Sequence, residues 1–335
     1  MFRSCAGPLA LVGLCAAALA ACADPPKPEG GNRVATALAF AHEYGTPDAL
    51  VPANDRDLKV RLISALGKAP ELTPDAAAAF TARDAYRALA GDGPLPVAKM
   101  DALLRARVPK SRAEMHAKLR AHADLLTTQF DAIGVAHHKP NDELVKWIVK
   151  HYEPGKELGA IVMCTGNTRR SMLGATMGNV AAAYYGLPGV RFYSGGTAPD
   201  AFNPRTVATL KEIGVEIEPT GKEAARGKAD APNPIYRVCW AKGLETVEFS
   251  KKYTDAHNPQ TGFASILVCS EADDACPVVP GARARIAVPY LDPKAFDGAP
   301  FESAKYAERR DDIGRFMLSA LMQARRRLEL DGKLK

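Results

Sequence analysis

Aromatic residues and a strong excess of charge of one sign are both scarce in this chain of 335 residues. Phe, Trp and Tyr together make up 7% of it, and 44 basic residues nearly balance 38 acidic ones, which gives a formal net charge of +6. A nucleic-acid-binding domain usually carries a much larger basic excess, gathered on one face. The basic triplet at 325–327 is better explained as the solvated face of a helix, so we expect no nucleic-acid partner.

Long hydrophobic runs are also lacking, except at the start of the chain. Residues 1–22 contain one basic residue, Arg3, and then an uncharged stretch rich in Ala, Leu and Val that lasts until Asp24. This pattern is typical of a secretory signal, and it is short for a membrane span of about 20 apolar residues. The following residues, 23–33, are rich in Pro and Gly, so we expect them to form a flexible tether.

The end of this segment, Leu19-Ala20-Ala21-Cys22, resembles the lipobox of bacterial lipoproteins. The resemblance implies that Cys22 is diacylated and becomes the mature N-terminus. The protein is then expected in the cell envelope, exported and held by its N-terminal lipid on a bacterial membrane, facing the periplasm. An ordinary cleaved signal and an uncleaved anchor helix are the two alternatives.

Cysteine and histidine are too sparse in the remainder to suggest a metal centre. Cys239 stands beside Trp240 and is expected to be a buried apolar residue. The neighbouring pair His137 and His138 has no further ligand at metal-binding spacing nearby. We therefore expect neither a metal ion nor a cofactor.

The body of the chain divides into two regions. Residues 34–150 show no strand-like run and are expected to form an all-helical region, in which Ser111 and Glu114 would make a capping box. Residues 151–335 alternate β-branched runs with helical patterns, which favours a parallel sheet covered by helices. The expected helices of the first region are 34–43, 56–67, 74–90, 96–106, 111–132 and 141–151.

In the second region the pattern predicts an α/β fold with a parallel four-stranded sheet flanked by helices. An insertion follows the second expected helix, and it contains a hairpin at 235–240 and 245–250. The expected strands are 158–163, 190–194, 265–269 and 285–290, and the expected helices are 171–185, 204–213 and 303–330.

The residues that could carry chemistry follow the first expected strand. Cys164 is separated by five residues from Arg170, which is followed by Ser171. A polar loop between a strand and a helix directs backbone N–H groups and the positive helix end at one point, where an anion binds. The same groups favour a cysteine thiolate, and a guanidinium can hold two oxygens of an oxyanion. The oxyanion-binding loop is therefore expected to comprise Thr165, Gly166, Asn167, Thr168, Arg169 and Ser171, and Asn167, which tolerates a left-handed backbone conformation, can brace it.

The string Cys-Thr-Gly-Asn-Thr-Arg-Arg-Ser resembles the phosphate loop of the low-molecular-weight protein tyrosine phosphatases and of the thioredoxin-coupled arsenate reductases. The resemblance covers about residues 158–330, with 219–262 outside it, and implies the same fold. It implies that Cys164 is the nucleophile, Arg170 binds the oxyanion, and Asp292, in Asp292-Pro293, is the general acid. Two departures are Thr168-Arg169, where many family members have a second cysteine, and a lone Phe296 where an aromatic pair grips phosphotyrosine.

Three functions remain open. The first is a phosphomonoester hydrolase, similar to the protein tyrosine phosphatases, that works through a thiophosphate intermediate. The second is an arsenate reductase, because Cys269 and Cys276 resemble the redox segment of that family and would relay oxidation to an envelope thioredoxin-like reductant. The two cysteines could instead form a structural disulfide. The third is a lipoprotein without catalytic activity that binds phosphate or another oxyanion.

Overall fold

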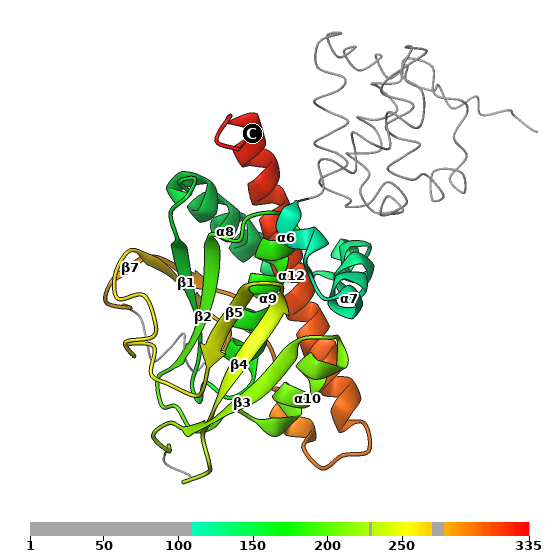
Figure 1. Cartoon of the computed structure of the whole chain (residues 1–335), viewed down its shortest axis with the longest axis vertical. Coiled ribbons are helices and arrows are strands. Elements are labelled where there is room, and N and C mark those ends of the chain that lie inside the picture. Colours follow the sequence, from blue (N-terminus) through cyan, green and yellow to red (C-terminus); the bar gives the residue numbers. More distant parts are fainter. Residues whose placement is uncertain (1–108, 228–229, 270–277, 335) are drawn as a thin grey trace, which may run out of the picture.

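The computed structural model describes residues 109–227, 230–269 and 278–334 (Figure 1). Several sequence-based predictions lie outside these residues. They are the signal with Cys22, the tether 23–33, the helices expected at 34–43, 56–67, 74–90 and 96–106, and Cys276.

A parallel four-stranded sheet forms the centre of the fold, as the sequence predicts. Its strands are β1 (Leu158–Cys164), β2 (Val190–Gly196), β6 (Phe263–Leu267) and β7 (Ala282–Ala287), in the spatial order β2-β1-β6-β7. Nearly every residue of β1 is buried, which is usual for an inner strand of a parallel sheet. The strand β7 begins earlier and ends earlier than the predicted 285–290.

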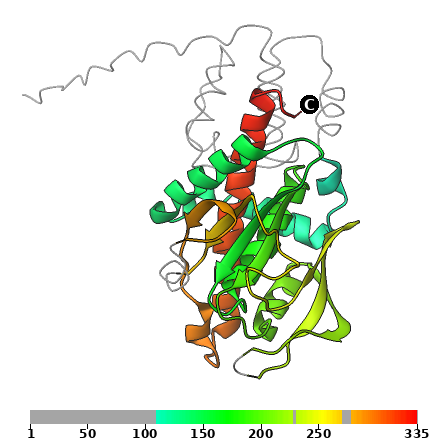
Figure 2. The same ribbon diagram turned by 90° about the vertical axis from the view of Figure 1, so that its left-hand side faces the viewer.

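Helix α9 (Arg170–Tyr184) lies between this sheet and the long helix α12 (Glu302–Leu330), as Figures 1 and 2 show. All fifteen residues of α9 are buried. Two glycines allow the close approach to the sheet. A Cβ atom at Gly174 would lie 2.6 Å from Val162 Cγ1, and one at Gly178 would overlap the ring of Phe192. Helix α10 (Pro204–Glu212) begins at Asn203, whose side chain accepts a hydrogen bond from a backbone N–H of its first turn.

The helices before β1 share the hydrophobic core of the sheet region. They are α6 (Lys110–Ala113), α7 (Ala117–Thr127) and α8 (His138–His151), with short 3-10 turns at Phe130–Ala132 and Val135–His137. Leu119, Leu126, Leu144 and Ile148 are fully buried in the same cluster as α9 and α12. The described part of 34–150 contains helices and 3-10 turns with short non-helical connections, and one bridge joins Met115 to Ala241; the helix expected at 111–132 is interrupted at 114–116 and at 128–129. The rest of that region is not described.

The predicted capping box at Ser111 is wrong. Ser111 lies inside α6, after the cap residue Pro109, and its hydroxyl donates a hydrogen bond of 2.7 Å to the carbonyl of Ala183 in α9. Glu114 ends the helix. A tertiary partner has therefore replaced the local one, and α6 is only four residues long.

The insertion forms a second sheet, which is antiparallel. Its strands are β3 (Glu216–Glu223), β4 (Pro234–Ala241) and β5 (Leu244–Glu248), in that order. The sequence predicts the hairpin of β4 and β5, whose turn places Gly243 at a φ of +72°. It does not predict β3. Among the described helices, none combines the length and the apolar character that crossing a bilayer would require.

Candidate active site

The loop after β1 turns its carbonyl groups outward. The carbonyls of Thr165, Gly166 and Thr168 accept backbone hydrogen bonds of 2.9, 3.0 and 3.2 Å from the segment 198–203. In a trans peptide unit the C=O and the following N–H point in opposite directions. The N–H groups that follow these carbonyls therefore face away from that segment, at the N-terminus of α9. Such a ring of donors is a binding site for an anion.

Asn167 holds the loop from beneath. It is fully buried and has a φ of +46°, in the left-handed region that Asn tolerates better than most residues. Its Oδ1 accepts a hydrogen bond of 2.8 Å from the backbone of Lys251, and its Nδ2 donates one of 2.9 Å to Ser171 Oγ. Ser171 Oγ in turn lies 3.0 Å from Cys164 Sγ. The hydroxyl accepts from Asn167, so its own proton can be donated to a Cys164 thiolate.

Arg170 and Asp292 lie opposite each other at the mouth of the loop. Arg170 donates a hydrogen bond of 2.8 Å to the carbonyl of Tyr290, and another of its nitrogens lies 3.0 Å from Asp292 Oδ2. The guanidinium is buried, whereas the carboxylate is one third exposed. Asp292 also caps a 3-10 turn, where its Oδ1 accepts from the backbone of Lys294. The structure thus brings the expected acid and the expected oxyanion ligand together.

The backbone of Arg169 belongs to the loop, but its side chain points to partners outside the loop. It donates to Tyr306 Oη at 2.7 Å and to Asp297 Oδ2 at 3.0 Å, which ties the loop to α12 and to the turn before it. Burial first, and then the hydrogen bond to Asp297, raise the pKa of Tyr306 to about 12. Tyr306 therefore stays a neutral phenol at physiological pH.

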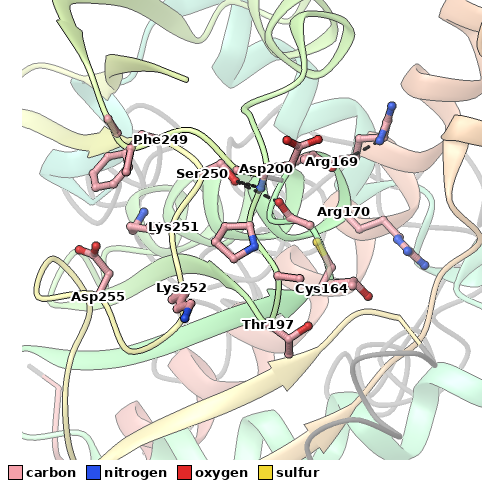
Figure 3. Close-up of a pocket in the computed structure, with 18 of the residues that line it drawn as sticks. Cys164, Arg169, Arg170, Thr197, Asp200, Phe249, Ser250, Lys251, Lys252 and Asp255 are labelled. Atoms are coloured by element: carbon pink, nitrogen blue, oxygen red, sulfur yellow. Dashed lines mark hydrogen bonds between the residues drawn. The ribbon is translucent and has the colours of Figure 1, made fainter. Parts of the chain in front are cut away.

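A pocket of about 1140 Å³ opens above the loop (Figure 3). Cys164 and Arg170 line it together with Asp292. The insertion supplies a further wall, made by residues 224–227 and by residues on the segment 249–255, including Lys252. Sequence reasoning missed this wall because no motif marks it.

The aromatic residue of the pocket also differs from the expected one. Of the described residues that line the pocket, Phe249 is the aromatic one. Phe296 packs against Phe301 instead, with a ring distance of 5.6 Å. The aromatic contact thus comes from the insertion rather than from the turn after Asp292.

The insertion is fastened to the loop by close backbone contacts. Ser250 Oγ donates to the carbonyl of Gly166 and accepts from the N–H of Asp200, both at 3.0 Å. At Gly196 a Cβ atom would lie 2.7 Å from the carbonyl oxygen of Thr165. Gly196 ends β2, and its N–H donates a hydrogen bond of 2.9 Å to the carbonyl of Lys251, so this glycine connects the loop to the inserted wall.

A buried ion pair lies beneath this junction. Lys251 Nζ is 2.8 Å from Glu248 Oε2, and the two side chains are 2% and 3% exposed. Ser194 Oγ donates a hydrogen bond of 2.7 Å to the same carboxylate. Because the backbone of Lys251 also holds Asn167, the pair anchors the segment that supports the loop.

The first cysteine of the expected redox pair lies beside the loop. Cys269 is fully buried, and its Sγ lies 3.7 Å from Thr165 Oγ1. The structure thus brings Cys269 to the same site as Cys164, while Cys276 lies outside the described residues.

Comparison with known proteins adds no relative: no protein-family model and no curated protein matches the chain.

Proposed function

We propose that the chain is a cysteine-dependent phosphomonoester hydrolase, similar in fold and mechanism to the low-molecular-weight protein tyrosine phosphatases. One observation carries the proposal. Cys164 Sγ lies at a loop whose N–H groups are turned away from their supporting segment, next to the facing pair Arg170 and Asp292. The loop also lies at the carboxyl end of an inner strand of the parallel sheet, which is where ligands bind in open α/β folds.

In the first step the Cys164 thiolate attacks phosphorus in line with the ester oxygen. The sulfur–phosphorus bond forms while the phosphorus–oxygen bond to the leaving group breaks. Loop N–H groups and Arg170 stabilise the equatorial oxygens. An entering oxyanion replaces Asp292 as the partner of Arg170, so that Asp292 can take up a proton and give it to the leaving oxygen.

In the second step water attacks the thiophosphate. Asp292, now ionised, accepts a proton from this water while the phosphorus–sulfur bond breaks. Inorganic phosphate is released, and Cys164 returns to its thiolate. Ser171 Oγ, at 3.0 Å from the sulfur, stabilises the leaving thiolate by a hydrogen bond.

The size of the pocket favours a phosphoester over a bare oxyanion. At about 1140 Å³ it exceeds the range of roughly 300–1,000 Å³ that is usual for sites of small ligands. The inserted wall therefore has room for the organic part of a substrate. Basic side chains of Arg226, Lys252 and Lys294 stand around the same space and suit an anionic substrate.

An arsenate reductase is the second candidate, because Cys269 lies beside the loop. Cys164 would attack arsenate, Cys269 would displace arsenite and form a disulfide with Cys164, and Cys276 would resolve it. The balance requires a dithiol of the thioredoxin kind, which supplies two electrons in each cycle.

One set of assays distinguishes these functions. We expect the mature chain to hydrolyse p-nitrophenyl phosphate and a phosphotyrosine peptide without added thiol, and Cys164→Ser to abolish this at unchanged thermal stability. Cys269→Ser and Cys276→Ser should retain most of the hydrolysis, since water regenerates the nucleophile. Absence of phosphatase activity, together with dithiol-dependent formation of arsenite that stops in both single variants, would establish the reductase instead.

We also propose that the protein is exported and anchored by a lipid at Cys22. A Cys22→Ser variant should leave the membrane fraction or accumulate as the unprocessed precursor. An unchanged mass and an unchanged membrane fraction would contradict the lipid anchor.

A further inference from the structure

A second group of chemically reactive side chains lies outside the active-site pocket. His116 precedes α7, Glu216 begins β3, and Cys239 lies on β4. His116 Nε2 is 3.6 Å from Glu216 Oε1 and 3.8 Å from Cys239 Sγ, and the three atoms all lie within 4.8 Å of one another. Imidazole nitrogen, thiolate sulfur and carboxylate oxygen are the three ligand types that zinc takes from proteins.

The spacing agrees with a tetrahedral ion. Zinc bonds to these atoms are about 2.0–2.3 Å long, and a tetrahedral angle then places neighbouring ligand atoms about 3.4–3.6 Å apart. The two distances to His116 Nε2 exceed this range by 0.2 Å at most. Small side-chain rotations would close such gaps. The third distance, between Glu216 Oε1 and Cys239 Sγ, is at most 4.8 Å, so the exposed carboxylate would move by up to about 1 Å to complete the tetrahedron.

The orientation of the imidazole is already fixed. His116 Nδ1 lies 3.2 Å from the carbonyl oxygen of Gly214, an atom that can only accept a hydrogen bond. With an ion bound, Nε2 gives it a lone pair, and the remaining proton sits on Nδ1 and is donated to this carbonyl. Metal-binding histidines in proteins are held in this way by a partner of their second nitrogen.

The backbone also places the three ligands independently of an ion. Glu216 and Cys239 are directly paired across β3 and β4, so their side chains project from the same face. The segment before α7 is joined to β4 by the bridge from Met115 to Ala241 and by a hydrogen bond from the N–H of His116 to the carbonyl of Trp240.

The surrounding charge is suited to a cation. Glu216 supplies one carboxylate, and Glu245, paired with Cys239 on the other side, supplies a second. Arg237, on the same strand as Cys239, pairs with Glu245 at 3.0 Å, so these two charges offset each other and Glu216 supplies the negative charge nearest to the ion. Cys239 is buried while Glu216 is exposed, so an ion would be reached from solvent through the carboxylate side.

We propose that His116, Glu216 and Cys239 form a site for one divalent transition-metal ion, zinc by its ligand set, with water in the fourth position. Three protein ligands and an open position are compatible with zinc. The ion would join the helical segment before β1 to the inserted sheet that walls the active-site pocket. The sequence gives no sign of this site, because its ligands are 100 and 23 residues apart and match no spacing motif.

Cobalt provides a direct probe, because a thiolate bound to Co²⁺ produces a charge-transfer band in the near ultraviolet. The mature chain, freed of any affinity tag and treated with a chelator, should develop this band with one equivalent of Co²⁺ and lose it on addition of Zn²⁺. Cys239→Ser should abolish the band. The matched controls Cys269→Ser and Cys164→Ser should retain it.

The other two ligands are tested by affinity and stability. Glu216→Gln, an exposed and isosteric change, should weaken zinc binding more than about tenfold, since even the loss of an outer partner of a ligand costs that much. Zinc should raise the unfolding temperature of the wild type and leave that of Cys239→Ser unchanged. A wild type without the band, a band that survives in Cys239→Ser, or equal affinity in Glu216→Gln would each overturn the proposal.

Discussion

The buried pair of Glu248 and Lys251 offers the sharpest test of how the active-site loop is supported. Both side chains are almost fully buried, at 3% and 2% exposure, and their closest atoms are 2.8 Å apart. Breaking a buried ion pair by removing one charge leaves the other uncompensated, which costs about 3–5 kcal/mol. We therefore expect Glu248→Gln to lower the free energy of unfolding by about this amount. For a folded region of this size that corresponds to a fall of roughly 6–20 °C in the unfolding temperature.

Two further variants make the measurement specific. Replacing both partners by apolar residues of similar volume, Glu248→Leu with Lys251→Met, should recover much of the loss, because no isolated charge then remains. Glu245→Gln on the same strand, which breaks the exposed pair with Arg237, should leave the unfolding temperature nearly unchanged. Thermal unfolding followed by circular dichroism, in a chelator to exclude metal effects, provides the readout.

The activity of the same variants tests the connection to the loop. The backbone of Lys251 donates to Asn167, so loosening this segment should also lower kcat/KM for a phosphomonoester at temperatures where the variant is still folded. A Glu248→Gln variant whose free energy of unfolding lies within about 1 kcal/mol of the wild-type value would refute the reasoning about the buried pair. So would a double variant that is less stable than the single one.

Three further predictions follow from the site and its supports. Asp292→Ala should slow hydrolysis of esters with poor leaving groups at least about tenfold more than hydrolysis of p-nitrophenyl phosphate, because only the former need a proton; equal losses would remove Asp292 from the acid role. Gly196→Ala would push a methyl group against a carbonyl of the oxyanion loop and should reduce activity strongly. Gly134→Ala should not, because a Cβ atom at Gly134 would meet no atom within 4 Å. Equal activity of the two variants would disprove this close contact. Burial opposes ionisation of Asp311, but hydrogen bonds from its neighbours, His122 among them, outweigh it and hold the pKa of the carboxyl below its ordinary value. The stabilisation is therefore present above the unfolded-state pKa of about 3.9 and is lost as pH falls through the lower folded value. Asp311→Asn should thus be less stable than the wild type at pH 7 and should lose less stability on acidification. Parallel curves of stability against pH for the two proteins would contradict this.

The central sheet and its helices could be predicted from the sequence because each has a clear local pattern. The run 158–163 is continuously apolar, and it is an inner, buried strand. The strand β3 could not be predicted, because it contains Pro219 and Gly221, and Ile217 is its one buried residue. Its place is set by pairing with β4 instead. The hydroxyl of Ser111 likewise found a partner 72 residues away, which a local motif does not reveal.

Some residues of the candidate site could likewise be predicted from the sequence and others could not. The residues from Cys164 to Ser171 are contiguous, and a short polar loop between an apolar strand and a helix pattern predicted an oxyanion loop there. Asp292 required the resemblance to a known motif, since 121 residues separate it from Ser171. The inserted wall, with Phe249 and Lys252, shows neither a contiguous motif nor a resemblance to a known one. Its residues reach the pocket through long-range contacts such as that between Ser250 and Gly166.

The complete burial of α9 couples the volume of the core to the geometry of anion binding. This helix is pressed onto the sheet at Gly174 and Gly178, and its first residue is Arg170. Any side chain larger than hydrogen at either glycine would have to lift the helix, and the N-terminal turn would tilt with it. A substitution at Gly174 or Gly178, one or two helical turns after Arg170, should thus change the affinity for an oxyanion, although neither glycine belongs to the loop. Changes in packing volume at these two buried glycines would therefore alter the loop without replacing any residue of the loop itself.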